Sequence, residues 1–253
     1  MNIFRSFPQT AVTEFTNLKD HVLNNRDLIV CETPKIIRKL FEHNIKIHKL
    51  LCTEDFLPHI PSHFEGEVYV ASDELLNSIA GFKVHYQVLA LADKPKDHSL
   101  KDLDHKIFYL NGLSSAENIG SIARSLAGFD INSLIVDGKT CSPFVRRAIR
   151  VSMGNIFQLK VHHSKNLLPT LSFLKSLGYL IVGTANRPDA HDLTTFKLPE
   201  KVVFIIGSEG HGMDDETLSQ CDIFMKIPIN STVAHLNASH AATIFMYEIS
   251  RQK

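Results

Sequence analysis

Cysteine and long apolar runs are both scarce in this sequence. Its four cysteines are scattered over 253 residues without a C-x-x-C pair, which is typical of reduced, mostly buried thiols rather than of a disulfide scaffold. No apolar run approaches the roughly 20 residues that a membrane helix needs, and the first ten residues lack the apolar stretch of a secretory signal. We therefore expect a cytoplasmic protein with no membrane partner.

The sequence also has no excess of positive or negative charge. The 27 Lys and Arg residues balance 27 Asp and Glu residues, which excludes a polyanion binder that works by bulk charge, so any nucleic-acid site must be a local patch. The 14 histidines lack zinc-ligand spacing and have no cysteine partners nearby, and we expect no metal site. Hydrophobic residues make up 44% of the chain, as in an ordinary globular protein.

Short apolar segments alternate with helical patterns along the whole chain. In the second half the apolar segments are nearly continuous, as is typical of strands covered on both faces. This order predicts an α/β fold around a parallel sheet. Strands are expected at 28–32, 46–52, 86–92, 106–110, 133–137, 156–161, 179–185, 202–207 and 223–228, and helices at 33–44, 72–79, 116–128, 143–150, 166–177 and 237–250.

A polar segment with charges of both signs separates the two halves. It contains Pro95 and follows the expected strand at 86–92, and such segments are typical of domain boundaries. We therefore expect a first domain at residues 1–95, a linker at 96–104 and a second domain at 105–253.

Three segments of the second half combine apolar elements with polar residues. The first, NGLSSAENIGSIARSLAGFD, follows a strand and presents Asn118 and Arg124 on a helix, where they could bind an anion. A capped amphipathic helix with a solvated arginine explains the same pattern.

The second segment, VVFIIGSEGHGMD, is a buried strand that leads into a glycine-rich turn. Its glycines allow close approach of a ligand to the backbone. The spacing fits neither a dinucleotide-binding motif nor a P-loop, and it is not a nucleophile elbow because Ile206 stands where that motif needs glycine. Taken alone, the turn is weak evidence for a site.

The third segment, FMKIPINSTVAHLNASHAATIFMYEI, has a polar loop between two strongly apolar elements. The strand ends at Pro228, and a helix begins near Asn237, where asparagine is most often a cap. Because the loop is polar and its neighbours are apolar, it must be folded inward or bound to something.

In this order and spacing the three segments resemble the motifs of the SpoU (TrmH-like) RNA ribose 2′-O-methyltransferases of the SPOUT superfamily. The resemblance covers residues 105–253, and RRAIRVSMGNIF also resembles a family segment around Ser-x-Gly. The first motif, N-x-G-x-x-x-R, is matched by Asn118, Gly120 and Arg124; the second, G-x-E-x-x-G, by Gly207, Glu209 and Gly212; and the third, I-P-M-x-G-x-x-x-S-L-N, by Ile227, Pro228, Leu236 and Asn237.

The resemblance implies a trefoil-knotted, parallel-sheet α/β methyltransferase domain, an obligate homodimer, S-adenosylmethionine as cofactor and RNA as substrate. Residues 1–95 are similar to the small, ribosomal-protein-like α/β substrate-binding domain of many members. Carried over to this chain, the cofactor would contact Thr184, Gly207, Ile227 and Leu236, and the catalytic set would be Asn118, Arg124, Glu209 and Asn237, with Arg124 supplied by the partner subunit.

Arginine is always protonated at physiological pH and is a poor general base. Arg124 is therefore expected to hold the neighbouring RNA phosphate and to stabilise negative charge on the ribose oxygen, with the proton passing to that phosphate or to water. His235 stands where the family has serine and Ser231 where it has glycine, and both depart from the family pattern.

Two basic clusters outside these motifs are candidate RNA contacts. Arg146, Arg147 and Arg150 share one expected helix, and Lys35, Arg38 and Lys39 share another, although solvated helix faces would look the same. The favoured substrate is ribosomal RNA because of the first domain. Transfer RNA is the alternative within the same chemistry, and an RNA-binding or ribosome-assembly factor without catalysis is the alternative outside it.

Overall fold

The computed structural model describes residues 1–16, 18, 23, 25–84, 86–208, 210, 212–230, 232–233 and 235–252. Contacts divide the chain into two compact units. Unit 1 consists of Met1–Pro95 and Phe144–Phe157, and unit 2 consists of Lys96–Pro143 and Gln158–Lys253. Residues 144–157 were expected in the second domain at 105–253, but their contacts group them with unit 1.

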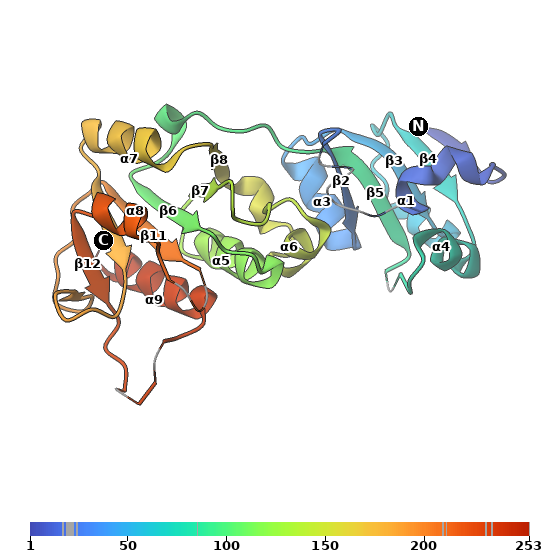
Figure 1. The fold of residues 1–253 in the computed structure, drawn as a ribbon. Helices are drawn as coiled ribbons and strands as arrows, with labels where there is room; N and C mark the ends of the chain where they lie inside the picture. Colours follow the sequence, from blue (N-terminus) through green and yellow to red (C-terminus); the bar gives the residue numbers. More distant parts are fainter. Residues whose placement is uncertain are drawn as a thin grey trace. The chain divides into compact units, whose positions relative to one another are not determined.

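Unit 1 is built on a mixed sheet of five strands in the order β1-β4-β3-β5-β2 (Figure 1). Strand β4 pairs in parallel with β1 and β3, whereas β5 pairs antiparallel with β3 and β2. The strands are Asn2–Phe4 (β1), Leu28–Glu32 (β2), Ile47–Cys52 (β3), Glu67–Val70 (β4) and Val88–Asp93 (β5). The helices are Thr13–Thr16 (α1), Pro34–Glu42 (α3), Asp73–Ala80 (α4) and Arg146–Val151 (α6), with 3₁₀ turns at Gln9–Val12, Glu54–His59 and Asn155–Gln158.

Unit 2 is built on seven parallel strands in the order β10-β12-β9-β11-β6-β7-β8. This confirms the predicted α/β fold around a parallel sheet. The strands are Lys106–Asn111 (β6), Ser133–Asp137 (β7), Lys160–Ser164 (β8), Leu180–Thr184 (β9), His191–Asp192 (β10), Val202–Gly207 (β11) and Ile223–Lys226 (β12). The helices are Ala116–Gly128 (α5), Leu167–Ser176 (α7), Asp215–Gln220 (α8) and Ala238–Arg251 (α9), with a 3₁₀ turn at Leu100–Asp102.

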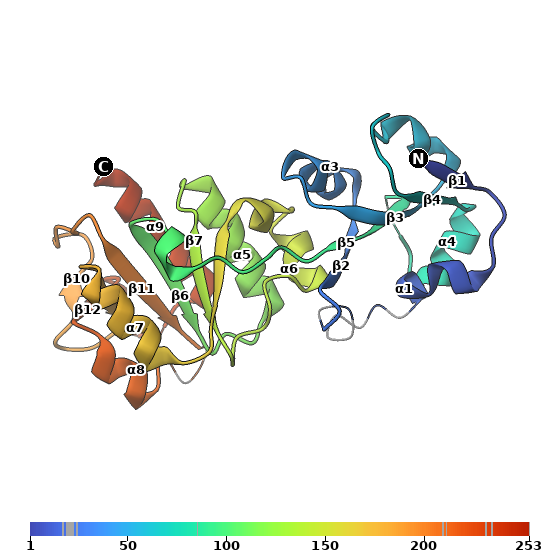
Figure 2. The same ribbon diagram turned by 90° about the horizontal axis from the view of Figure 1, so that it is seen from above.

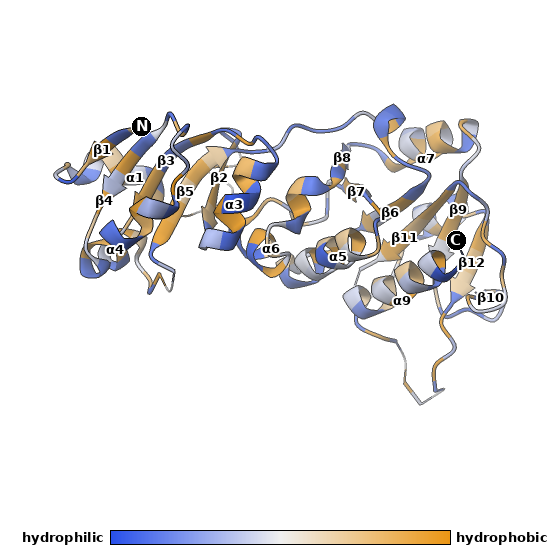
Figure 3. Ribbon diagram, turned by 180° about the vertical axis from the view of Figure 1, so that it is seen from behind, coloured by the Kyte–Doolittle hydropathy of each residue, from blue (hydrophilic) through white to orange (hydrophobic). Residues whose placement is uncertain are grey.

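Both faces of the second sheet are covered, which explains why its strands are largely apolar except for the edge strands β8 and β10 (Figure 3). Side chains alternate between the faces of a strand. On β6, Ile107 and Tyr109 pack with Leu171 and Leu174 of α7. On the other face Phe108 stacks with Phe204 of β11, which contacts Phe245 of α9. Figure 2 shows α7 and α8 on one side of the sheet and α5 and α9 on the other.

The prediction of a strand at 156–161 was partly wrong. Residues Asn155–Gln158 form a 3₁₀ turn, and the strand runs over Lys160–Ser164. Met153 and Gly154 both have positive φ, of 54° and 73°, and their N–H groups donate to the carbonyls of Arg150 and Ile149, so α6 ends before Ile156. Ile156 and Phe157 are nevertheless buried, and a short buried apolar run looks the same in the sequence whether it is a strand or a turn.

All four cysteines are unpaired, as expected. Cys31 and Cys52 are buried, and burial raises the pKa of the Cys52 thiol to about 12. Because the thiolate is the reactive form, these cysteines act as packing residues. Of the helices that the structure describes, none combines the length and the apolar character that spanning a membrane requires.

Candidate functional site

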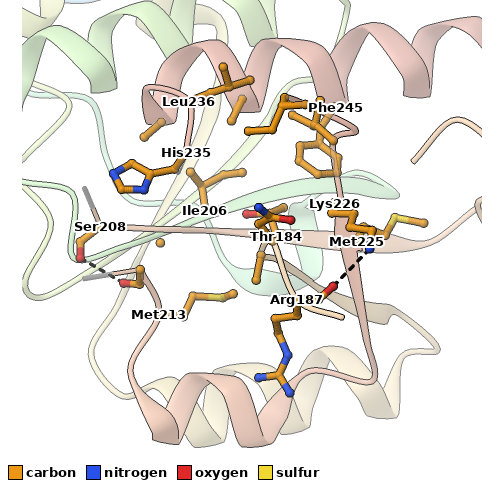
Figure 4. A pocket seen from close by; sticks show the side chains of 18 of the residues that line it. Thr184, Arg187, Ile206, Ser208, Met213, Met225, Lys226, His235, Leu236 and Phe245 are labelled. Carbon is orange, nitrogen blue, oxygen red and sulfur yellow. Dashed lines mark hydrogen bonds between the residues drawn. The ribbon is translucent and has the colours of Figure 1, made fainter. Parts of the chain in front are cut away.

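A cavity of about 450 Å³ opens in unit 2 at the carboxyl ends of three neighbouring strands (Figure 4). Strands β12, β9 and β11 are adjacent and parallel, and ligands of open α/β sheets bind at this edge. Helix α9 covers the cavity with Ala238, Ala241 and Phe245. The strands and loops contribute further lining residues, among them Thr184, Arg187, Ile206, Gly207, Ser208, Gly210, Gly212, Lys226, Ile227, His235 and Leu236.

All four residues predicted to contact the cofactor line this cavity, namely Thr184, Gly207, Ile227 and Leu236. They come from β9, β11, the segment after β12 and the loop before α9. The structure thus brings together residues that lie up to about 50 positions apart in the sequence. Apolar side chains such as Ile206 and Phe245 form much of the wall, which suits a flat aromatic group.

The turn after β11 reverses the chain within five residues. The backbone N–H groups of Ser208 and Gly212 each donate to the other residue's carbonyl, at 3.1 and 3.0 Å. Gly210 and Gly212 have φ of +85° and +68°, a region that favours glycine. A Cβ atom on Gly207 would lie 2.7 Å from the carbonyl carbon of Gly212 and from the nitrogen of Met213. Only glycine at position 207 therefore lets the turn fold back against the strand.

The end of β9 is tied to both neighbouring strands. The Thr184 hydroxyl donates to the Ile205 carbonyl of β11 at 2.7 Å, and the Ala185 N–H donates to the Met225 carbonyl of β12 at 3.0 Å. These bonds continue the ladder where the regular sheet ends. Thr184 therefore stabilises the shape of the cavity wall through its side chain.

Two cations stand at one end of the cavity. The Arg187 guanidinium pairs with Asp189, with Nε 2.9 Å from Oδ1, and lies over the Phe224 ring at 4.3 Å. Its hydrogen bond lowers the pKa of the Asp189 carboxyl below the ordinary value. Lys226 donates to the Arg187 carbonyl at 3.3 Å (Figure 4). Arg187 thus has its own counter-ion, and Lys226 adds a second positive charge to this wall.

Two of the predicted catalytic residues are in direct contact. Asn237 donates from Nδ2 to Oδ1 of Asn118 at 3.0 Å, which joins the start of α9 to the first turn of α5. Oδ1 of Asn237 accepts from the backbone N–H groups of Ser239 and His240, at 2.9 and 3.4 Å. Asn237 is therefore the helix cap that its position suggested, and its amide also fixes the side chain of Asn118.

The two halves of the Asn237 amide can be separated by mutation. Asn237→Ala removes the cap and should lower the free energy of unfolding by about 1 kcal/mol. Asn237→Asp keeps the cap oxygen and should retain that stability, but it loses the donor to Asn118. Urea denaturation of both variants measures the difference, and equal losses would mean that the link to Asn118 carries the stability instead.

Arg124 lies on α5 with an exposed side chain. Among the residues that the structure describes, no ion-pair partner for its guanidinium is found. The neighbouring Ser125 faces α9, where its hydroxyl lies 2.9 Å from that of Thr243. The helix is thus anchored through Ser125 while Arg124 stays accessible to a ligand or to another chain.

Glu209, the remaining residue predicted to be catalytic, lies outside the described residues. Within the described ranges, no group of three or more His, Cys, Asp or Glu side chains could hold a metal ion.

The two predicted RNA-binding clusters both belong to unit 1, on α3 and α6. Arg150 donates to the buried carboxylate of Glu32 at 3.2 Å, and Nη1 of Arg146 lies 4.0 Å from the same oxygen. The Arg146 guanidinium also lies over the Phe82 ring at 4.4 Å. These two arginines therefore help to fix α6 within unit 1.

The other members of the clusters differ in exposure. Lys39 donates to Asn155 at 2.6 Å and is half-buried, whereas Lys35, Arg38 and Arg147 have exposed side chains. The exposed members are the better placed to meet an RNA phosphate.

Sequence reasoning missed Asp137, which organises the loop between β6 and α5. Its carboxylate accepts from the Gly112 N–H at 3.1 Å, the Asn111 amide at 3.0 Å and the Thr140 hydroxyl at 2.7 Å. Residues Asp137 to Thr140 read D-G-K-T at the end of a strand, which is a turn signal. That signal could have identified the turn but not its contact with the loop that leads to Asn118.

The segment that builds the cavity matches a known family. A sequence model of the SpoU rRNA methylase family matches residues 105–247, more than half of the chain. The chain belongs to this family. It is therefore an RNA methyltransferase of the SpoU type, as its three motifs indicated.

Relatives of this SpoU-family chain extend over nearly its whole length. An uncharacterized tRNA/rRNA methyltransferase of Mycobacterium tuberculosis is 25% identical over 238 residues, which cover 88% of this chain and 81% of the relative. The AdoMet-bound rRNA methyltransferase from Sinorhizobium meliloti has a TM-score of 0.85 at 19% identity, covering 99% of this chain and 97% of that one. An RNA 2′-O ribose methyltransferase structure has a TM-score of 0.79 at 20% identity, covering 99% and 98%. The SpoU chain thus shares its fold with these two solved structures.

Proposed function

We propose that this SpoU-family chain transfers a methyl group from S-adenosylmethionine to a ribose 2′-hydroxyl of ribosomal RNA. The observation that carries the proposal is the cavity at the carboxyl ends of β9, β11 and β12. All four residues that are expected to contact the cofactor line this cavity. The solved relative with bound AdoMet and the relative named as an RNA 2′-O ribose methyltransferase support this choice of donor and acceptor.

The residues of the cavity fit the cofactor. Its volume of about 450 Å³ lies within the range of small-molecule sites. Ile206, Ile227 and Leu236 provide apolar wall for an adenine ring, and glycine at position 207 lets the turn after β11 pack against the strand beside the cavity. Lys226 lines the cavity and offers a cation for the carboxylate of the methionine moiety. When bound, the cofactor supplies an electrophilic methyl group on sulfonium.

The residues of the chain act mainly by positioning. Alignment of a hydroxyl with the methyl carbon accounts for a large part of the acceleration in such displacements. Asn118 and Asn237 form a fixed pair of amides beside the cavity loop, and Glu209 completes the polar set in this proposal. Arg124 binds the RNA phosphate next to the target ribose and stabilises negative charge on the oxygen.

The proposed active unit is a homodimer in which Arg124 reaches the cavity of the partner subunit. Its exposed side chain supports this arrangement, as do Ile244 and Tyr247 on α9, which are 38% and 55% exposed. The proposal also includes a trefoil knot and a cytoplasmic location. It further assigns residues 1–95 to a ribosomal-protein-like substrate-binding domain, which the linker at 96–104 joins to the second domain.

For the RNA contacts we propose Lys35, Arg38 and Lys39 on α3 with Arg146, Arg147 and Arg150 on α6. The double variant Lys35→Ala/Arg38→Ala should reduce the slope of log affinity against log salt by about 0.7 for each phosphate that is no longer neutralised. Fluorescence anisotropy with labelled ribosomal RNA fragments measures the slope. Lys101→Ala/Lys165→Ala removes the same charge from exposed positions in unit 2 and should leave it unchanged. Equal slopes for the two double variants would remove α3 from the RNA site.

Deletion of the gene tests the proposed function. Mapping of 2′-O-methylated nucleotides in RNA from deleted and complemented cells should show one site in ribosomal RNA that loses its methyl group. Loss of a site in transfer RNA would move the chain to the alternative substrate. Unchanged methylation in both RNAs, together with no binding of S-adenosylmethionine by calorimetry, would favour a binding factor without catalysis.

A further inference from the structure

His235 is distinctive among the residues that line the cofactor cavity. The other ionisable side chains among the described lining residues are Arg187 and Lys226, which are cations at neutral pH. A histidine side chain in water is largely neutral above about pH 6.5. Within the described part of the wall, His235 therefore contributes the one imidazole, whose unprotonated ring nitrogen is an acceptor.

The position of His235 suits contact with RNA. Its side chain is exposed, and Figure 4 shows the imidazole on the side of the cavity where Ser208 and Leu236 lie, away from Arg187. Two residues further along, Asn237 caps α9 and is bonded to Asn118 at 3.0 Å. The imidazole thus stands at the cavity on a segment that is anchored beside the polar pair.

Among the described residues that line the cavity, the imidazole of His235 is the one group that can act as a base. Arg187, after β9, and Lys226, on β12, face the same cavity and are cationic, while α8 and α9 contribute the uncharged Leu218 and Ala238. None of the described lining residues is a carboxylate. Glu209 and His211 lie outside the described residues.

We propose that His235 accepts the proton of the ribose 2′-hydroxyl during methyl transfer. The inference rests on the proposed function and assigns a role to a residue that departs from the family motif. The ribose oxygen bonds to the methyl carbon as its proton passes to an imidazole nitrogen. The carbon–sulfur bond breaks with its electron pair left on sulfur, which yields the neutral thioether product, and the imidazolium then releases its proton to water.

The pH dependence of the reaction tests the role. With sub-saturating cofactor and ribosomal RNA extracted from cells that lack the gene, the pH profile reports groups of the free protein, and the single-turnover rate of the natural protein should rise about tenfold per pH unit in acid and then level off. His235→Gln removes the base and should lower the plateau rate by about 100-fold. The rise of the rate with pH in acid, the acid limb of the profile, should also be lost in this variant. His235→Ser, which restores the family residue, should lose the same limb.

A second measurement does not depend on activity. Titration of the His235 ring protons by NMR, in the protein without cofactor, should give a midpoint that matches the acid limb of the rate profile. His240→Gln changes another exposed histidine that does not line the cavity and should alter neither. Calorimetry should show that His235→Gln still binds S-adenosylmethionine.

The outcomes separate the inference from the proposed function. If His235→Gln keeps both the rate and the acid limb, His235 is not the proton acceptor while the methyltransferase proposal stands. A ring titration that does not match the acid limb overturns the inference in the same way. If the natural protein transfers no methyl group to the RNA, both proposals fall together.

Discussion

Arg124→Lys is expected to lower the single-turnover rate of methyl transfer by about 100-fold. Lysine keeps the positive charge but lacks the planar pair of donors with which arginine grips a phosphate. Arg124 is exposed on α5, and the helix is anchored through the neighbouring Ser125. A lower rate in Arg124→Lys would therefore not be explained by a loss of folding stability. The measurement is a rapid-quench assay with labelled cofactor and RNA from cells lacking the gene.

Cofactor binding separates this result from damage to the site. Calorimetry should give the same affinity for S-adenosylmethionine in Arg124→Lys and in the natural protein, because Arg124 does not line the cavity. Arg26→Lys changes an exposed arginine of unit 1 and should leave the rate unchanged. A natural rate in Arg124→Lys would remove Arg124 from the reaction.

The second large effect is expected for Gly207→Ala, which should weaken binding of S-adenosylmethionine by about 100-fold, or about 2.7 kcal/mol. The added Cβ would lie 2.7 Å from backbone atoms of Gly212 and Met213. Backbone cannot move aside as a flexible side chain can, so the turn must shift into or away from the cavity. Overpacking of this kind also costs about 1–3 kcal/mol of stability.

Gly128→Ala is the matched control for Gly207→Ala. Position 128 ends α5, and a Cβ atom there meets nothing within 4 Å, so both cofactor affinity and stability should be retained. Calorimetry gives the affinity, and urea denaturation gives the stability. Natural affinity in Gly207→Ala would show that the turn after β11 does not contact the cofactor.

The two variants can be combined to test the composite site. A dimer with one Arg124→Lys chain and one Gly207→Ala chain would contain one intact site if Arg124 serves the cavity of the partner subunit. Such dimers, purified through two different tags after co-expression, should recover about half of the natural activity per dimer. If Arg124 serves the cavity of its own chain, each site keeps one defect and activity stays low.

Helix positions were the most predictable part of the fold. Helix α5 was expected at 116–128 and spans Ala116–Gly128, because its apolar residues repeat at helical spacing and the Ser115 hydroxyl accepts from the Asn118 N–H at 3.3 Å. Short elements were less visible. Strand β4 at Glu67–Val70 and helix α8 at Asp215–Gln220 were not predicted, because four to six residues carry too little periodicity.

The candidate site was predictable only where a motif marked it. Gly207 and Leu236 lie in motifs of the family, and both line the cavity. Arg187 and Phe245 line it too, but no motif contains them. Their place in the wall follows from the sheet order β12-β9-β11 and from the packing of α9 on β11, and neither is encoded in local spacing. The attachment of α6 to Glu32 depends in the same way on tertiary contacts between segments far apart in the sequence.

Transfer of a labelled methyl group to RNA in vitro tests the central claim most directly. The purified protein is incubated with methyl-labelled S-adenosylmethionine and ribosomal RNA from cells lacking the gene, and the RNA is digested to nucleosides. The account predicts that the label is recovered in a single 2′-O-methylated nucleoside. Label on a base, or no label in RNA despite bound cofactor, would contradict it.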